Sequence, residues 1–277
     1  MDVRRLRTNI NIGVLGGGNM AEALIKGLLA GGVPTGSLTV SEPSEQRRGM
    51  LSEGYGVHTT NDNEELIKAS DVIILAVKPQ VFDVALKGMA NVSADGKLFI
   101  SIMAGITCAD IEGTLAPGAR VVRSMPNTPA LVLEGMTAVS RGTLATDEDI
   151  FLTSSLFNLV GKTCVVDEEL LDAVTGISGS GPAYVLTFIE ALSDAGVKHG
   201  FSRDVALLLA AQTVCGTAKL LLESHEHPAV LKGKVASPGG TAIAAMHSLD
   251  CDGFRAAIIN AVDVCIARSK ELVARRI

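Results

Sequence analysis

The sequence predicts an α/β protein whose first half is a doubly wound, mostly parallel sheet and whose second half is entirely helical. Up to residue 166, short apolar runs alternate with segments of helical periodicity, which is typical of a parallel sheet with helices on both faces. After Asp167, helical periodicity continues and no segment has the pattern of a strand. We therefore expect two domains, residues 1–166 and residues 167–277, in a chain long enough for two hydrophobic cores.

A glycine-rich loop lies between the first predicted strand and the first predicted helix. Ile12–Leu15 is an apolar run suited to a buried strand, and apolar residues at helical spacing follow as far as Leu29. Between them, Gly16, Gly18 and Ala21 match the G-x-G-x-x-G/A fingerprint of a dinucleotide-binding unit. Small residues there permit a tight turn, close approach of N–H groups to a pyrophosphate, and close helix packing. The pattern predicts a Rossmann-type unit, with an ordinary glycine-rich turn as the alternative.

The alternation continues along the first half. Further strands are predicted at residues 38–40, 72–77, 98–102, 121–122, 136–139 and 163–166, with a helix at residues 147–160. Ala76-Val77-Lys78-Pro79 should form a loop at the carboxyl end of its strand, because proline cannot continue a ladder. Doubly wound sheets bind their ligands at that end of the strands.

The loop after residues 38–40 leaves the choice of cofactor open. In a dinucleotide-binding unit it meets the adenosine ribose, where an acidic residue binds the hydroxyls of NAD and Arg or Ser favours the additional phosphate of NADP. Glu42 favours NAD. The neighbours that favour NADP are Ser41, Ser44, Arg47 and Arg48. The two arginines also fit a solvated helix face.

The second half is predicted to contain only helices, at residues 169–175, 182–199, 202–224, 229–235, 241–249 and 254–274. The two longest are too apolar for the surface of a monomer, so we expect a homodimer built from this half. The apolar segment at residues 205–222 is interrupted by polar residues such as Gln212 and Lys219, so we expect a helix buried nearly all round, in a bundle or a subunit interface, and no membrane span.

The composition argues against several other partners. A formal net charge of -6, 3% aromatic residues and the absence of Trp fit neither a nucleic-acid backbone nor a base-stacking platform. The N-terminal arginines precede no apolar segment of signal-peptide character. The five cysteines are scattered without C-x-x-C spacing, so we expect reduced thiols, no metal site and a cytoplasmic protein.

Two glycine-rich patches open predicted helices of the second half. They are Ser178-Gly179-Ser180-Gly181-Pro182-Ala183-Tyr184 and Ser237-Pro238-Gly239-Gly240-Thr241. Each places backbone N–H groups and a hydroxyl at a helix N-terminus, which is suited to a carboxylate. Close packing through small residues is the alternative for the first patch, and a plain helix cap is the alternative for the second.

Five motifs together resemble those of pyrroline-5-carboxylate reductases, in the same order and at the same distances. They are Gly16–Ala21, Ala76–Pro79, Met125–Ala130, Ser178–Tyr184 and Ser237–Thr241. The resemblance extends from Ile10 to Leu272. It implies NAD(P)H-dependent reduction of the C=N bond of L-1-pyrroline-5-carboxylate to L-proline, the last step of proline biosynthesis. It also implies a dimer whose helical halves intertwine and which often assembles further.

The resemblance implies roles for individual residues. Those expected to bind NADP(H), or NAD(H), are Gly16, Gly18, Asn19 and Met20 at the pyrophosphate, Ser41, Glu42, Pro43 and Asn63 near the adenosine ribose, and Ala76, Val77, Lys78, Pro79, Ala104 and Gly105 at the nicotinamide ribose. Those expected to bind the substrate carboxylate are Ser237, Gly239, Gly240 and Thr241. The cofactor supplies the hydride and an iminium already carries its proton, so no catalytic His is required.

Three positions depart from the family's pattern. Ala242 replaces a usual threonine whose hydroxyl lies near the ring nitrogen, so we expect a slower enzyme in which Thr241, our catalytic candidate, or a water takes over part of that role. Gly233 stands where Asp is common. Glu42 stands where many relatives carry a small polar residue, which favours NADH.

Two other functions remain open. A reductase or dehydrogenase of another small imino or hydroxy acid would share the two-domain plan, although that plan normally adds a catalytic Lys or acid–base residue that we do not find here. A non-catalytic dinucleotide-binding regulatory homologue would explain Ala242. The absorbance of reduced nicotinamide in the presence of pyrroline-5-carboxylate would separate these alternatives.

Overall fold

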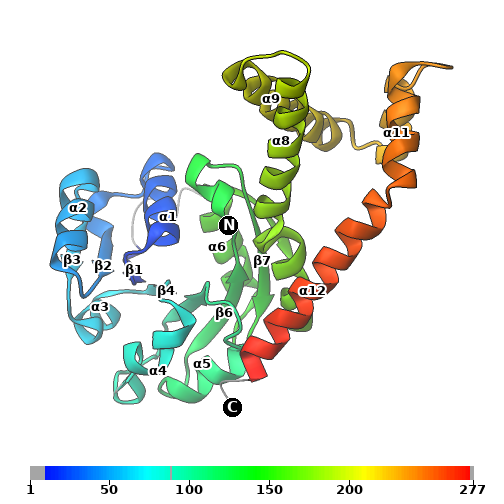
Figure 1. The fold of residues 1–277 in the computed structure, drawn as a ribbon. Helices are drawn as coiled ribbons and strands as arrows, with labels where there is room; N and C mark the ends of the chain where they lie inside the picture. The colour runs from blue at the N-terminus through cyan, green and yellow to red at the C-terminus, as the bar shows by residue number, and fades with distance from the viewer. Residues whose placement is uncertain (1–9, 88, 275–277) are drawn as a thin grey trace. The chain divides into compact units, whose positions relative to one another are not determined.

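The structure, a computed structural model, describes residues 10–87 and 89–274 (Figure 1). The described residues form two compact units. The sheet unit contains residues up to 180 together with residues from 265 onwards, and the helical unit contains residues 181–264. These units do not coincide with the two predicted domains, whose boundary after residue 166 stays a prediction.

Eight strands form one sheet in the order β3-β2-β1-β4-β5-β6-β7-β8. Their bounds are β1 Ile12–Leu15, β2 Leu38–Ser41, β3 His58–Thr60, β4 Val72–Leu75, β5 Leu98–Ser101, β6 Arg120–Met125, β7 Gly135–Arg141 and β8 Gly161–Val165. The first six strands are parallel, and their order is that of a doubly wound dinucleotide-binding fold. The predicted fold class is therefore confirmed for the sheet.

The last two strands run in the opposite direction, which the sequence analysis did not predict. β7 is antiparallel to β6, and β8 is parallel to β7. The connection from Met125 to Gly135 holds only the short 3₁₀ helix η5 (Thr128–Val132). A parallel connection needs about a dozen residues or more, usually including a crossover helix. The proline-containing turn is therefore too short for a parallel connection, and β7 pairs antiparallel to β6.

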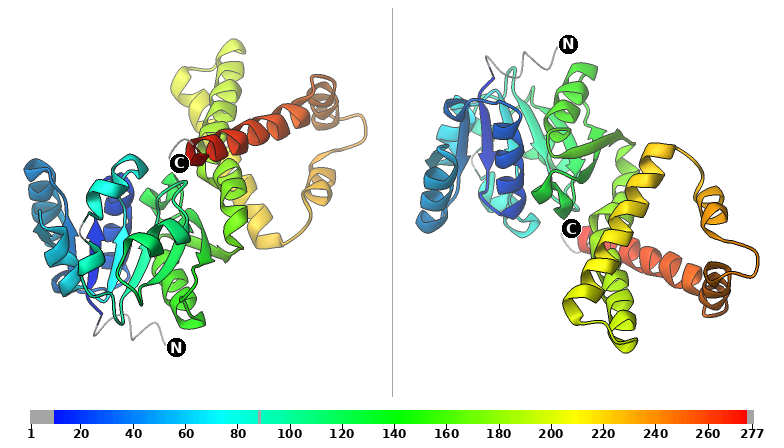
Figure 2. Two further views of the ribbon diagram at one scale, coloured as in Figure 1. Left: turned by 90° about the horizontal axis from the view of Figure 1, so that it is seen from below. Right: turned by 90° about the horizontal axis from the view of Figure 1, so that it is seen from above.

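Helices cover both faces of the sheet, and alternate strand residues face two separate cores (Figures 1 and 2). One core, which includes Val14, is covered by α1 (Asn19–Ala30), α2 (Glu45–Tyr55) and α6 (Asp147–Phe157). The other, which includes Leu15, is covered by α3 (Asn63–Ala69), α4 (Phe82–Ala85) and α5 (Cys108–Thr114). This is the doubly wound arrangement expected from the sequence.

The second half contains helices only, within the residues that the structure describes. The bounds are α8 Gly181–Lys198, α9 Arg203–Ser224, α10 Pro228–Val235, α11 Thr241–Cys251 and α12 Phe254–Ala274. These five predicted helices are confirmed to within two residues at each end. The helix expected at residues 169–175 is instead divided into a 3₁₀ turn, the short helix α7 (Leu171–Val174) and the π-helical turn η7 (Thr175–Gly179).

The helical unit exposes much of its apolar surface. α8 packs on α9 through small residues, because Gly196 leaves room for Ala206. Elsewhere large side chains face solvent: Leu186 is 64% exposed, Leu208 68% and Leu222 66%. Among the described helices, α9 alone is long and apolar enough to cross a membrane, and only 11% of its most apolar 18-residue window is buried. α9 is therefore not buried nearly all round within one chain, as a bundle helix would be.

Candidate functional site

The carboxyl ends of the parallel strands meet at one edge of the sheet. Leu15 at the end of β1 lies between Ser41 of β2 and Leu75 of β4, and Leu75 lies beside Ser101 of β5. The loops at this edge line a cleft of about 450 Å³. Nine of the predicted cofactor residues line it, namely Gly16, Gly18, Ser41, Glu42, Pro43, Asn63, Ala76, Val77 and Lys78.

The other predicted cofactor residues lie nearby in the chain but do not line the cleft. Asn19 and Met20 begin α1, Pro79 begins the 3₁₀ helix η3 (Pro79–Val81), and Ala104 and Gly105 follow β5 by a few residues. For all fourteen residues, contact with a cofactor stays a prediction.

Some lining residues were missed by sequence reasoning. They are Leu15, Gly17, Asn61, Val81, Val84 and Ala85. Asn61 follows directly after β3, so a prediction of that strand would have placed Asn61 at this edge. β3 is a three-residue strand, His58-Thr59-Thr60, with no apolar residue to mark it.

The glycine-rich loop has the geometry that the fingerprint demands. Gly16 adopts a φ of +102°, and a Cβ there would lie 2.8 Å from the carbonyl oxygen of Ala76. Its N–H donates to the Ser41 carbonyl oxygen at 2.8 Å, which fixes the turn against β2. A Cβ on Gly18 would meet nothing within 4 Å, so this side of the loop is open to a ligand. Both observations fit a dinucleotide held on the loop.

The predicted pyrophosphate site and the predicted carboxylate site lie at two helix starts that have no side-chain cap. Six helices begin with a side chain that accepts a hydrogen bond from their first turn: Ser44, Asp62, Thr107, Thr146, Ser202 and His227. By contrast, the residues that precede α1 and α11 are Gly18 and Gly240, which supply no side-chain cap. The helices α4 and α7 also lack a cap, but each has only four residues. The first N–H groups of α1 and α11, at the positive end of the helix dipole, thus have no side-chain acceptor and suit an anion.

The predicted carboxylate site is a tight turn that leads into α11. Gly239 adopts a φ of +66°, and the Gly240 N–H donates to the Ser237 carbonyl oxygen at 3.0 Å. A Cβ on Gly240 would lie 2.2 Å from Ser237 Oγ, so only glycine allows the hydroxyl this close to the helix start. Thr241 is exposed and Ala242 is half-buried. Ser237, Gly239, Gly240 and Thr241 are therefore grouped at one helix start, and their role in binding substrate stays a prediction.

The other glycine-rich patch is used for packing inside the sheet unit. The Asn127 side-chain amide donates to the Ser178 carbonyl oxygen at 3.0 Å, and the Met136 N–H donates to Asn127 Oδ1 at 2.9 Å. A Cβ on Gly179 would lie 2.9 Å from Met125 Cε. These contacts favour the packing interpretation of this patch.

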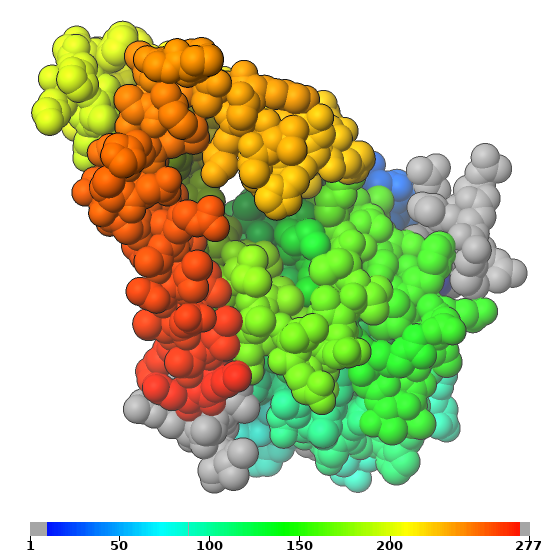
Figure 3. Space-filling model, turned by 90° about the vertical axis from the view of Figure 1, so that its right-hand side faces the viewer, coloured from blue at the N-terminus to red at the C-terminus, as the bar shows by residue number. Residues whose placement is uncertain are grey.

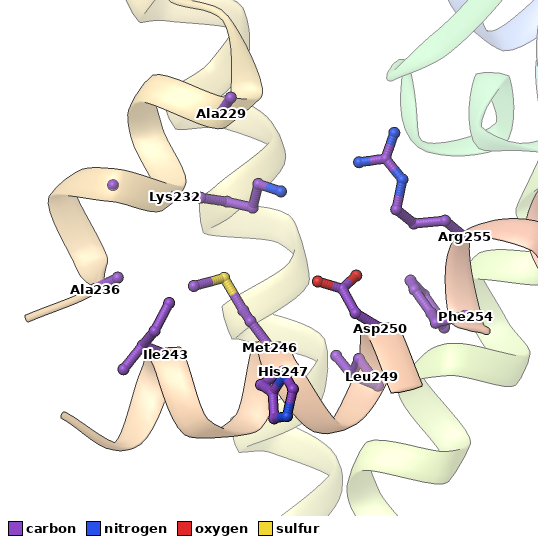
Figure 4. Close-up of a pocket in the computed structure, with 11 residues that line it drawn as sticks. Ala229, Lys232, Ala236, Ile243, Met246, His247, Leu249, Asp250, Phe254 and Arg255 are labelled. Carbon is purple, nitrogen blue, oxygen red and sulfur yellow. The ribbon is translucent and has the colours of Figure 1, made fainter. Parts of the chain in front are cut away.

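A second hollow, of about 720 Å³, lies in the helical unit and contains none of the predicted site residues. Its walls come from α10, α11 and the start of α12, and Figure 3 shows it between the golden residues of α10 and the orange residues of α11. Most of its lining is apolar, as with Ile243 and Met246, while Lys232 and Asp250 are directed into it (Figure 4).

Two family models match the chain. The model described as pyrroline-5-carboxylate reductase dimerisation matches residues 168–272, and the model described as NADP oxidoreductase, coenzyme F420-dependent, matches residues 11–105. The pyrroline-5-carboxylate reductase of Synechocystis is 46% identical over 95% of this chain and 98% of its own length. The Escherichia coli reductase is 40% identical over 94% of this chain and 97% of its own length.

Solved structures give the same result. A pyrroline-5-carboxylate reductase from Coxiella burnetii superposes with a TM-score of 0.91 at 35% identity, covering 96% of this chain and 99% of that one. The Plasmodium falciparum pyrroline carboxylate reductase, with NADP bound, superposes with a TM-score of 0.84 at 32% identity, covering 96% of this chain and 98% of that one.

A doubly wound sheet with a glycine-rich loop at its cleft defines the class of dinucleotide-binding proteins. The whole-chain similarity is more specific. This chain belongs to the pyrroline-5-carboxylate reductase family, as its five motifs predicted.

Proposed function

We propose that this chain reduces the C=N bond of L-1-pyrroline-5-carboxylate to give L-proline, using NADPH, and that each of its units binds one reactant. The observation that carries the proposal is the pair of helix starts without a side-chain cap, at Gly18 in the sheet unit and Gly240 in the helical unit. The reaction needs two anion sites of this kind, one for a pyrophosphate and one for a carboxylate. The similarity of the whole chain to pyrroline-5-carboxylate reductases supports this assignment.

The cofactor, when bound, supplies the hydride. The chain's own contribution is to hold and orient the reactants, which can account for much of a rate enhancement. In the sheet unit, the open side of Gly18 and the cleft beside it fit a dinucleotide. In the helical unit, the first N–H groups of α11 and the Ser237 hydroxyl would hold the substrate carboxylate. Thr241, beside them, would accept a hydrogen bond from the iminium N–H through its hydroxyl oxygen, in place of the threonine that Ala242 replaces.

We also infer a homodimer formed by the helical units. The exposed leucines of α8 and α9 and the mostly apolar hollow between α10 and α11 are surfaces that a second copy can bury. The match of residues 168–272 to a dimerisation family supports this. The apolar character of α9 is then explained by the subunit interface rather than by a membrane.

The cytoplasm is the compartment that we propose. All five cysteines of the chain are free thiols in the structure, which suits a reducing environment.

One assay tests the activity. Purified protein is mixed with NADPH and pyrroline-5-carboxylate, and the loss of reduced-nicotinamide absorbance and the formation of proline are both followed. We expect one proline for each NADPH consumed. Turnover only with another cyclic imine or a hydroxy acid would favour a related reductase, and NADPH binding without any turnover would favour a regulatory homologue.

A further inference from the structure

The cofactor cleft presents an acidic side chain where an adenosine ribose is expected. Glu42 is half-buried and follows directly after β2, at the edge where a dinucleotide-binding unit meets that ribose. Its Oε2 accepts a hydrogen bond of 2.9 Å from the Gly17 N–H, and its Oε1 accepts one of 3.0 Å from the Ser44 N–H. The carboxylate is therefore fixed beside the glycine-rich loop, in the lining of the cleft.

Arg47, one of the candidates for a phosphate ligand, forms hydrogen bonds with protein groups. Its Nε donates to the Gly17 carbonyl oxygen at 2.6 Å, and its Nη2 donates to Glu22 Oε2 at 2.5 Å. The Tyr55 hydroxyl donates to the other oxygen of Glu22 at 2.8 Å. The hydrogen bonds from Tyr55 and Arg47 lower the pKa of Glu22, which keeps the carboxylate charged and paired with the guanidinium.

The remaining candidates for a phosphate site also have partners within the protein. The Ser41 hydroxyl, in the lining of the cleft, donates to Asn63 Oδ1 at 2.5 Å. Arg48 Nη1 donates to the carbonyl oxygens of Glu42 and Pro43, at 2.7 and 2.9 Å. The Ser44 hydroxyl accepts the Arg47 N–H as the cap of α2. Neither arginine contributes to the lining of the cleft, whereas Glu42 does. The sequence left the choice between NAD and NADP open, and these contacts favour NAD through Glu42.

We propose that Glu42 is a specificity-determining residue that shifts the cofactor selectivity of this chain from NADPH towards NADH. This rests on the proposed function, because it requires a dinucleotide in this cleft. The 2′-hydroxyl of NADH can donate a hydrogen bond to an ionised carboxylate. The 2′-phosphate of NADPH carries up to about two negative charges, and it meets a like charge in a half-buried place where salt screens weakly.

Direct binding tests the proposal without relying on turnover. Dissociation constants for NADH and for NADPH are measured by nucleotide fluorescence on the full chain and on Glu42→Gln and Glu42→Ser, with no imine present. The control is Glu45→Gln, which removes an exposed charge from the first turn of α2 outside the cleft. Glu42→Gln keeps the size and removes the charge, but it keeps only one of the two oxygens that accept from the Gly17 and Ser44 N–H groups. Glu42→Ser removes both oxygens, so a similar shift in the two variants assigns the effect to the charge.

We expect both Glu42 variants to bind NADPH more tightly and NADH more weakly, so that the ratio of the two constants moves by about tenfold. The control should move it by less than about twofold. An unchanged ratio in both Glu42 variants, or weaker NADPH binding, would overturn the proposal. A shifted ratio in a protein that does not reduce pyrroline-5-carboxylate would uphold the role of Glu42 while refuting the proposed function.

Discussion

Ala242 is the residue at which we expect the largest departure from the family's pattern at the predicted substrate site. It is the second residue of α11 and is half-buried directly after Thr241. The side chain ends at Cβ, so it cannot hydrogen-bond a reacting nitrogen. The neighbouring hydroxyl is that of Thr241. Adjacent side chains on a helix point about 100° apart, so the Thr241 hydroxyl cannot occupy the place of a hydroxyl at position 242. A substitution that restores a hydroxyl at position 242 therefore measures its contribution to the turnover number.

We predict that Ala242→Thr raises the turnover number. One hydrogen bond to the reacting nitrogen is worth about 1–2 kcal/mol, which is roughly a 5- to 30-fold gain in rate. The matched control is Ala242→Val, which has the shape of threonine without its hydroxyl. Steady-state kinetics with pyrroline-5-carboxylate would show the gain in the threonine variant alone. No gain, or an equal change in both variants, would mean that the ring nitrogen lies elsewhere.

Glu22 links α1 to α2, and its ionisation should matter for stability. The Tyr55 hydroxyl and then the Arg47 guanidinium lower the pKa of Glu22 below its ordinary value of 4.5. Because the folded-state pKa is lowered, this contribution to stability is fully present above pH 4.5. It is lost as the pH falls through the folded-state value.

We therefore predict that Glu22→Gln lowers the thermal unfolding midpoint near neutral pH, and that the difference from the wild type shrinks as the pH falls below about 4.5. Calorimetry between about pH 7 and pH 3 measures both effects. Glu45→Gln, an exposed residue of α2, serves as the control with little expected effect. A difference that stayed constant with pH would assign the loss to packing rather than to charge.

Elements with strong periodicity were predictable from the sequence, and elements that depend on tertiary contact were not. The helices of the second half and the buried parallel strands follow from apolar spacing. β3 has no apolar residue, and the reversal of β7 follows from the length of one turn. In the cleft, the sequence predicted which residues follow most of the parallel strands and so lie at this edge of the sheet. The partners of Glu42 and Arg47 were not predictable, because side-chain direction is set by packing between α1, β2 and α2.

The turn into α11 gives a prediction at the scale of one element. The Gly240 backbone has a φ of −80°, which alanine can adopt, so Gly240→Ala acts through the contact of its Cβ with Ser237 Oγ. We expect the KM for pyrroline-5-carboxylate to rise by about tenfold, the size of one lost charge-assisted hydrogen bond, with no change in NADPH affinity.

The control for this turn is Gly49→Ala in the middle of α2, in the sheet unit, where a Cβ would meet nothing within 4 Å. Alanine in a helix interior favours folding by roughly 0.5–1 kcal/mol, so this variant should keep its KM and gain stability. Steady-state kinetics and thermal unfolding of both variants distinguish the two effects. An unchanged KM in Gly240→Ala would remove the start of α11 from the substrate site.

At the scale of the whole molecule, the distribution of apolar surface favours a partner subunit. The sheet unit buries its large apolar residues in two cores, while the helical unit leaves leucines along α8 and α9 exposed. Exposed apolar patches of this kind mark association surfaces. A symmetric dimer buries each residue of such a surface twice, so one substitution changes two contacts in the assembly.

We predict that Leu208→Lys, in the second turn of α9, converts the proposed dimer into monomers. Leu208 is 68% exposed in the single chain, and burying a leucine contributes about 1.5–3 kcal/mol for each copy, which the lysine replaces with the cost of desolvating a charge. The matched control is Met50→Lys on α2, which is 55% exposed but belongs to the sheet unit. Sedimentation equilibrium with steady-state kinetics should show a monomer of low activity for Leu208→Lys and an active dimer for Met50→Lys. A fully dimeric Leu208→Lys protein would show that α9 is covered by something other than a second copy of this chain.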